Sequence, residues 1–102
     1  MIVRSAPRFT LNLLVAFSGD QDGVGIIRNL SINGCCASSG TVVQLKQSLT
    51  LKFHPGDQGP LIVVDLADVR WASAWDFGVA FQSFEADEQR RLLQFITTLP
   101  SA

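Results

Sequence analysis

The stretch FTLNLLVAF, residues 9–17, places a large apolar side chain at every second position. The residues on this face are Phe9, Leu11, Leu13, Val15 and Phe17. Successive side chains of a β-strand point to opposite faces, so the period of two predicts a strand with one buried face. The other face carries Thr10, Asn12 and Ala16 and is free to meet solvent.

Extended segments recur along the chain, and turn-forming residues separate them. The cluster SGDQDG at residues 18–23 predicts a hairpin into the next strand, and two prolines and two glycines interrupt residues 54–60. Further strands are expected over residues 24–28, 35–37, 42–45, 49–53, 61–72 and 77–81. About six short strands at regular spacing, with glycine near the turns, predict a small antiparallel β-barrel over residues 9–82.

The last segment changes its period and predicts a C-terminal α-helix over residues 84–99. Leu92, Phe95, Ile96 and Leu99 follow the spacing of one helical face. Ser83 is the candidate N-cap, Glu85, Asp87 and Glu88 lie near the positive end of the helix dipole, and Pro100 marks the stop. We expect the apolar stripe to cover one end or side of the barrel; a partner-binding helix is the alternative.

Length and composition favour one domain spanning residues 1–102. The chain has 47% hydrophobic residues, enough for one core without metal or disulfide support. A net charge of -1 argues against a general DNA or RNA binder. No apolar run approaches the roughly 18 residues of a membrane span, and no signal-peptide pattern is present. We therefore expect a soluble cytoplasmic protein with no direct membrane insertion, in which the adjacent Cys35 and Cys36 are free thiols.

Residues that could support catalysis or metal binding are few. His54 is the single histidine and precedes a proline in a turn-forming segment, so a solvated loop position is expected. Asp20 and Asp22 suggest a metal loop only faintly, because the rest of a calcium-binding loop is missing. The sequence predicts neither an enzyme nor a metal site.

Two short fragments carry the candidate binding chemistry. Arg4 and Arg8 lie on a non-helical N-terminal arm, and each guanidinium offers a planar fork of donors that fits a phosphate or the edge of guanine. Asn29 and Ser31 project from the same face of an extended segment, and Gly34 follows in a turn where a base could approach the backbone closely. Taken separately, the first fragment is better explained as a solvated arm and the second as an ordinary polar turn. Together they suit a small, doubly charged guanine nucleotide.

At this point the pattern resembles the PilZ family, whose members carry Arg-x-x-x-Arg followed some twenty residues later by Asp or Asn-x-Ser-x-x-Gly. Arg4 and Arg8 match the first motif, and Asn29, Ser31 and Gly34 match the second. The segments at 49–53, 69–71 and 77–81 are similar to that family's later strands. The resemblance implies a six-stranded PilZ-type barrel that binds the bacterial second messenger cyclic di-GMP. It implies that Arg4 and Arg8 engage the phosphates and guanine faces of the ligand. Asn29, Ser31 and Gly34 would line the pocket, and Arg70 is a weaker candidate for ligand binding.

The resemblance also implies a mode of action. We expect a stand-alone receptor without a bound cofactor, whose mobile arm, residues 1–8, folds over cyclic di-GMP. Because only three residues precede Arg4, the signal is expected to pass to a separate protein partner, in motility, adhesion and biofilm, or polysaccharide control. The alternative is a ligand-independent interaction adaptor related to type IV pili or motility. A single-stranded nucleic-acid barrel fits less well, because most aromatic residues lie at core-spaced positions.

Overall fold

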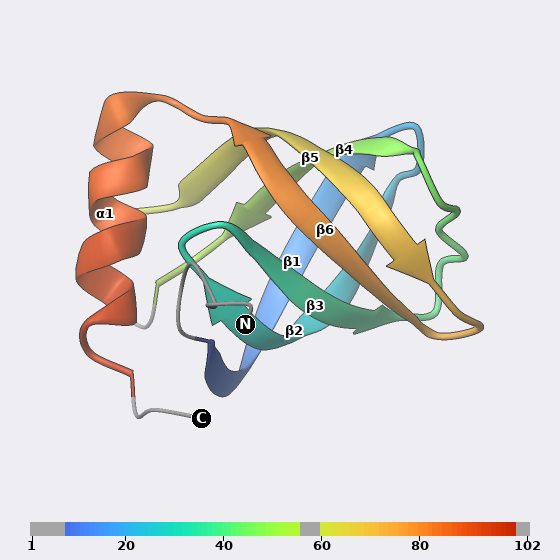
Figure 1. The fold of residues 1–102 in the computed structure, drawn as a ribbon, viewed down its shortest axis with the longest axis horizontal. Coiled ribbons are helices and arrows are strands. Elements are labelled where there is room, and N and C mark those ends of the chain that lie inside the picture. Colours follow the sequence, from blue (N-terminus) through green and yellow to red (C-terminus); the bar gives the residue numbers. More distant parts are fainter. Residues whose placement is uncertain (1–7, 56–59, 100–102) are drawn as a thin grey trace, which may run out of the picture.

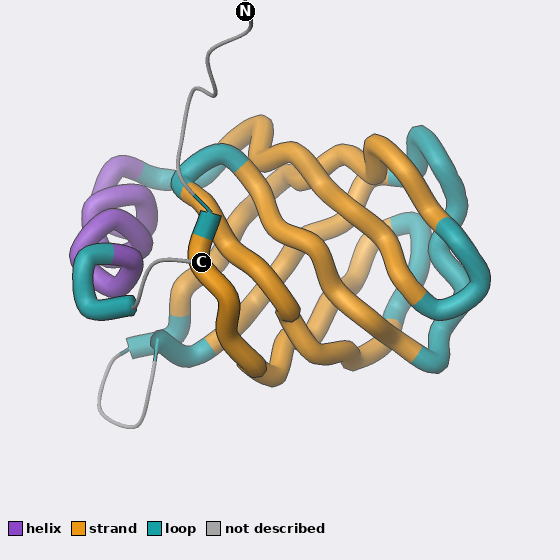
Figure 2. Tube along the Cα trace, turned by 60° about the horizontal axis from the view of Figure 1, so that its bottom comes forward, coloured by secondary structure: helices purple, strands orange, loops and turns teal. Residues whose placement is uncertain are grey.

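Six antiparallel strands form a closed barrel, and one helix follows them, in a computed structural model that describes residues 8–55 and 60–99. The elements are β1 (Phe9–Gly19), β2 (Gly23–Ser31), β3 (Gly34–Ser39), β4 (Ser48–Phe53), β5 (Ile62–Ala72), β6 (Asp76–Ser83) and α1 (Ala86–Ile96). Around the barrel the strands run in the order β1-β2-β3-β6-β5-β4, and α1 lies beside one end (Figures 1 and 2). The predicted six-stranded barrel with a C-terminal helix is confirmed.

Strand β1 supplies one buried face, as its alternation predicts. Val15 and Phe17 are buried, whereas Phe9, Leu11 and Leu13 are half-buried and pack against the core. The pairing of β1 with β2 shifts register between Thr10 and Leu13, near the start of the strand. Pairing of β1 with β4 closes the barrel, so the inward faces of all six strands share one hydrophobic core.

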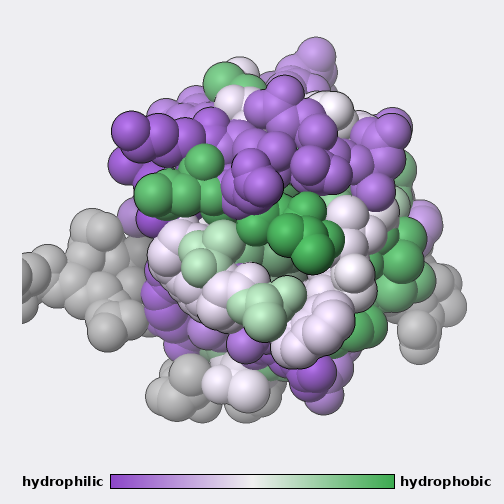
Figure 3. Space-filling view, turned by 90° about the vertical axis from the view of Figure 1, so that its right-hand side faces the viewer, coloured by the Kyte–Doolittle hydropathy of each residue, from purple (hydrophilic) through white to green (hydrophobic). Residues whose placement is uncertain are grey.

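The predicted strand over residues 42–45 is wrong, because these residues form a loop. Val42 and Leu45 are exposed and only Val43 between them is buried. Strand β3 lies beside β6, whereas β4 lies beside β1, so the connection must cross the end of the barrel. Residues 42–45 belong to no strand pair, and the connection meets β5 at Lys46 and Gln47, which hydrogen-bond to the Val69 backbone. The connection turns into β4 at Lys46, whose φ of 74° is left-handed. Figure 3 faces this end of the barrel and shows apolar surface bordered by hydrophilic side chains.

Helix α1 begins later and ends earlier than residues 84–99. Its N-cap is Glu85 rather than Ser83, and the Glu85 side chain makes no capping hydrogen bond. Leu92 and Ile96 are buried in the barrel's core, so the apolar stripe covers the barrel as expected. Pro100 lies outside the described residues.

Polar contacts also hold α1 against the start of β5. An oxygen of Glu88 accepts a hydrogen bond of 2.6 Å from the Val63 backbone N–H. Arg91 donates a hydrogen bond of 3.1 Å to the Leu61 carbonyl and forms an ion pair with Glu88, three residues earlier in the helix. The helix is therefore attached to the barrel by both its apolar face and a charged pair.

The acidic residues of the β1–β2 turn stabilise the turn and connect it to β4. Asp22 accepts a hydrogen bond from the Gly19 N–H, and Asp20 accepts one of 2.8 Å from the Ser48 N–H at the start of β4. Within residues 8–55 and 60–99, no cluster of three or more His, Cys, Asp or Glu side chains could hold a metal ion. No helix in this part of the chain is long and apolar enough to cross a membrane.

Candidate functional site

A hollow lies on the outer surface of the barrel, across four neighbouring strands of which the middle two carry small residues. The register sets Asn29 opposite Cys36, Cys36 opposite Gly78, and Gly78 opposite Trp71, on β2, β3, β6 and β5. Larger groups stand at the two sides and small ones at the centre, so the surface dips over β3 and β6. The hollow has a volume of about 210 Å³.

Arg8 lies at one side of this hollow, just before β1 begins. Its Nη1 donates a hydrogen bond of 2.8 Å to Oδ1 of Asn29, which lies 21 residues further along the chain. Pairing of β1 with β2 creates this contact, because it sets Phe9 opposite Leu30 and Thr10 opposite Asn29. The structure thus joins one residue from each of the two predicted motifs.

Arg70 and Trp71 line the hollow from its other side, on β5. A Cβ added at Gly78 would overlap Nε1 of Trp71, so the indole lies directly over the glycine backbone. Trp71 is nevertheless 44% exposed. The hollow therefore has a guanidinium on each side and an accessible aromatic ring beside one of them.

The turn between β2 and β3 uses Ser31 and Gly34 in its own construction. Ser31 is only 2% exposed, and its hydroxyl donates to the Gly34 carbonyl and accepts a bond of 3.1 Å from the Asn33 N–H. A Cβ at Gly34 would overlap the Val79 carbonyl oxygen, so the close approach of β6 requires glycine here. Of these residues, Asn33, Gly34 and Val79 line the hollow and Ser31 does not.

The two cysteines face opposite ways and are free thiols. The Cys35 side chain lies in the core, where burial and the neighbouring Cys36 raise its pKa from 9.0 to about 12, although Arg8 acts in the opposite direction. Cys36 is half-buried and lines the hollow. Adjacent residues of a strand point apart, so the two sulfur atoms are not placed to bridge with each other.

The sequence-predicted site residues are only partly brought together. Arg8, Gly34 and the weaker candidate Arg70 line one hollow, and Asn29 holds Arg8 at its edge. Arg4 lies outside the described residues. Sequence reasoning missed most of the other lining residues, among them Cys36, Trp71 and Gly78. The alternation of β3 and β6 could have indicated their outward positions, but not that they are neighbours.

Comparisons with known proteins agree with this architecture. The family model described as PilZ domain matches residues 2–98. The chain is similar to the solved structure of the Bacillus subtilis inhibitor of motility MotI/DgrA, with a TM-score of 0.79 and 21% identity over 96% of this chain. It spans only 51% of that protein's length.

A second similar structure is a PilZ domain of a cellulose synthase from a cellulose-synthesizing bacterium. Its TM-score is 0.70 with 10% identity, over 89% of this chain and 95% of that one. No curated protein sequence matches the chain. The family match covers the barrel and its helix almost completely, and the chain therefore belongs to the PilZ domain family.

Proposed function

We propose that this chain is a cyclic di-GMP receptor of the adaptor type, without catalytic activity, that signals to a separate protein. The observation that carries the proposal is the hydrogen bond between Arg8 and Asn29 at the edge of the hollow. It joins the two motifs that mark nucleotide-binding members of the family. The same bond sets the direction of the guanidinium of Arg8, which is otherwise exposed.

The chemistry of the hollow suits part of a cyclic guanine dinucleotide. Arg8 and Arg70 each present a planar fork of donors for a phosphate or for the O6 and N7 edge of guanine. Trp71 offers a flat face on which a purine can stack. Since ligand pockets usually measure at least about 300 Å³, a hollow of about 210 Å³ takes one base and leaves the rest of the ligand over the surface.

In this proposal the motif residues divide into two roles. Arg4 and Arg8 contact the ligand, together with Arg70 and Trp71. Asn29 acts as a positioning residue through Arg8, and Ser31 and Gly34 act by holding the turn that borders the hollow. The arm then becomes ordered over the ligand and presents a new surface to a partner. Control of motility is one process that such a partner could serve, since the similar protein MotI/DgrA is an inhibitor of motility.

Thermal unfolding with cyclic di-GMP, GTP and cyclic di-AMP tests the proposal. A rise in melting temperature with cyclic di-GMP alone is expected, because a ligand that binds only the folded state stabilises it by mass action. Titration calorimetry then gives the affinity and the number of ligands per chain. Folded protein that shows neither a shift nor heat of binding would contradict the proposal and favour the ligand-independent adaptor.

A further inference from the structure

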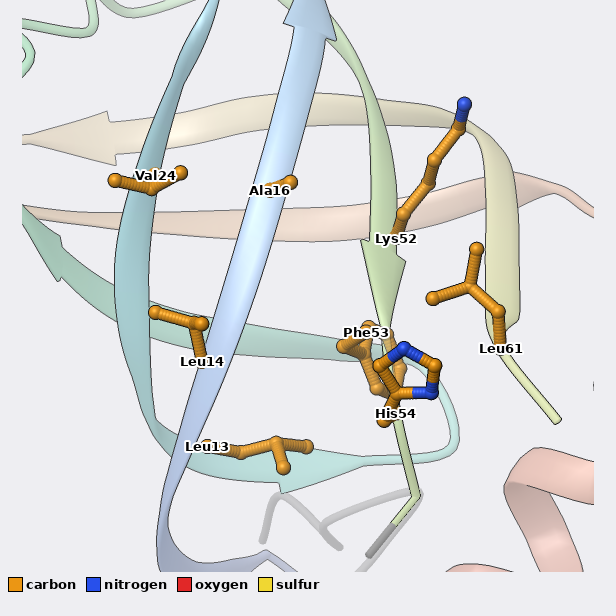
Figure 4. Close-up of a pocket in the computed structure, with 8 residues that line it drawn as sticks. All are labelled: Leu13, Leu14, Ala16, Val24, Lys52, Phe53, His54 and Leu61. Carbon is orange, nitrogen blue, oxygen red and sulfur yellow. The ribbon is translucent and has the colours of Figure 1, made fainter. Parts of the chain in front are cut away.

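A second hollow lies on the opposite side of the barrel from the candidate nucleotide site. It has a volume of about 390 Å³ and opens on the outer face of β1, between β2 and β4 (Figure 4). Ala16 lies at its centre, with Leu14 and Val24 on one side and Lys52, His54 and Leu61 on the other. We call this surface the Ala16 hollow.

The strand register explains why this surface is concave. Ala16 is set opposite Val24 on β2 and opposite Lys52 on β4. The small side chain therefore lies between two rows of larger ones that are about 10 Å apart, which is two inter-strand spacings. That gap is wide enough to receive one bulky side chain from another molecule.

The walls of the Ala16 hollow are unusually apolar for a surface that faces water. Leu14, two residues from Ala16 on β1, is 65% exposed, and Val24, opposite Ala16 on β2, is 60% exposed. Isolated exposed apolar residues are common, whereas contiguous ones around a concavity mark a surface that another molecule covers.

The barrel's closure and its charges restrict what that molecule can be. A closed barrel has no free strand edge, so a partner must engage side chains rather than add a strand. Among residues 8–55 and 60–99, Lys52 and His54 are the only titratable groups that line the hollow, and Lys52 has no ion-pair partner in this part of the chain. A second copy that packed its own Ala16 hollow against this one about a two-fold axis would bring the two Lys52 ammonium groups together, which is unfavourable.

We propose that the Ala16 hollow is a docking site for a segment of a different protein, which inserts a bulky apolar side chain over Ala16 and places a carboxylate against Lys52. The surface shares no lining residue with the nucleotide hollow, so ligand and partner can be bound at the same time. The proposal therefore does not depend on whether cyclic di-GMP binds.

A displayed library of short random peptides is the probe. Selection on the wild-type chain is expected to enrich peptides that combine a large apolar residue with Asp or Glu nearby. A synthetic peptide of the enriched sequence should perturb NMR signals of β1, β2 and β4. Its affinity should fall at least about tenfold for Ala16→Phe, which fills the hollow, and severalfold for Lys52→Glu. A peptide with Lys in place of its acidic residue should recover binding to Lys52→Glu.

Leu93→Ser is the matched control, because Leu93 is a 52% exposed apolar residue on α1 and outside the hollow. It should leave peptide affinity unchanged, and unaltered melting temperatures verify that all variants fold. Failure to enrich any acidic apolar peptide, or equal binding to wild type and Ala16→Phe, overturns the proposal. Sedimentation that shows a dimer abolished by Ala16→Phe also overturns it, because the occupant would then be a second copy.

Discussion

Replacing Arg8 and Asn29 singly and together tests how the proposed nucleotide site works. Arg8 contributes a charged donor, and hydrogen bonds to charged groups contribute about 1.5–3 kcal/mol. Because Arg8 is exposed, we expect the lower end of this range for Arg8→Ala, roughly a tenfold loss of cyclic di-GMP affinity. Arg8→Lys keeps the charge but loses the planar fork, and should fall between Arg8→Ala and wild type.

Asn29→Ala removes the acceptor that holds the guanidinium at 2.8 Å. Loss of one such contact costs about 0.5–1.5 kcal/mol, or roughly two- to twelvefold in affinity. Since Asn29 is proposed to act through Arg8, its replacement should have almost no further effect once Arg8 is alanine. The double variant should therefore resemble Arg8→Ala, and Asn29→Asp should keep the affinity because a carboxylate also accepts the bond.

Titration calorimetry on the four members of this cycle measures the coupling directly. Full additivity of the two losses would refute a positioning role for Asn29. Wild-type affinity in a folded Arg8→Ala variant would refute the contact between Arg8 and the ligand. Melting temperatures of all variants without ligand serve as the control for folding.

Four further outcomes are expected from the exposure or burial of particular side chains. Trp71→Ala should weaken cyclic di-GMP binding by about 1–3 kcal/mol through loss of base stacking, whereas Trp75→Ala, at a 64% exposed position outside the hollow, should not change the titration. Leu92→Ala removes a 0% exposed side chain that fixes α1 to the barrel, and should lower the free energy of unfolding by about 2–5 kcal/mol in urea titrations. The Cys35 thiol should stay unmodified by iodoacetamide near pH 8 in the folded chain, because burial raises its pKa to about 12, whereas Cys36, which lines the surface hollow, should react. The same pKa shift of Cys35 stabilises the folded state below pH 9.0, and this contribution to the free energy of unfolding should decline as the pH rises to about 12. Labelling of Cys35 at pH 8 would contradict the raised pKa. A free energy of unfolding that stays constant over this pH range in a Cys36→Ser background would contradict it as well.

The strands were largely predictable because their signal is local. The alternation at residues 9–17 appears directly as the buried face of β1, and the turn formers at 18–23 become the β1–β2 hairpin. Residues 42–45 show where this reasoning fails. An apolar run has the composition of a strand whether or not it pairs with a neighbouring strand, and residues 42–45 belong to no strand pair of the barrel.

The helix shows the same division between local pattern and context. Its apolar period identified Leu92 and Ile96 as core residues, and both are buried. Its first residue depended on how the segment before the helix packs. Phe84 packs against the core and against Phe81, with ring centroids 5.9 Å apart, so the chain enters the helix only at Ala86.

By itself, the sequence determined the barrel class, the C-terminal helix and the family motifs, because residue periodicity and short motifs act over a few neighbouring positions. Only the tertiary structure decided which outward-facing residues become neighbours. Arg8 meets Asn29 through the pairing of β1 with β2, and Trp71 lies over Gly78 through the pairing of β5 with β6. Both strand pairs contain register shifts, and a shift changes which side chains meet without altering either strand's own pattern.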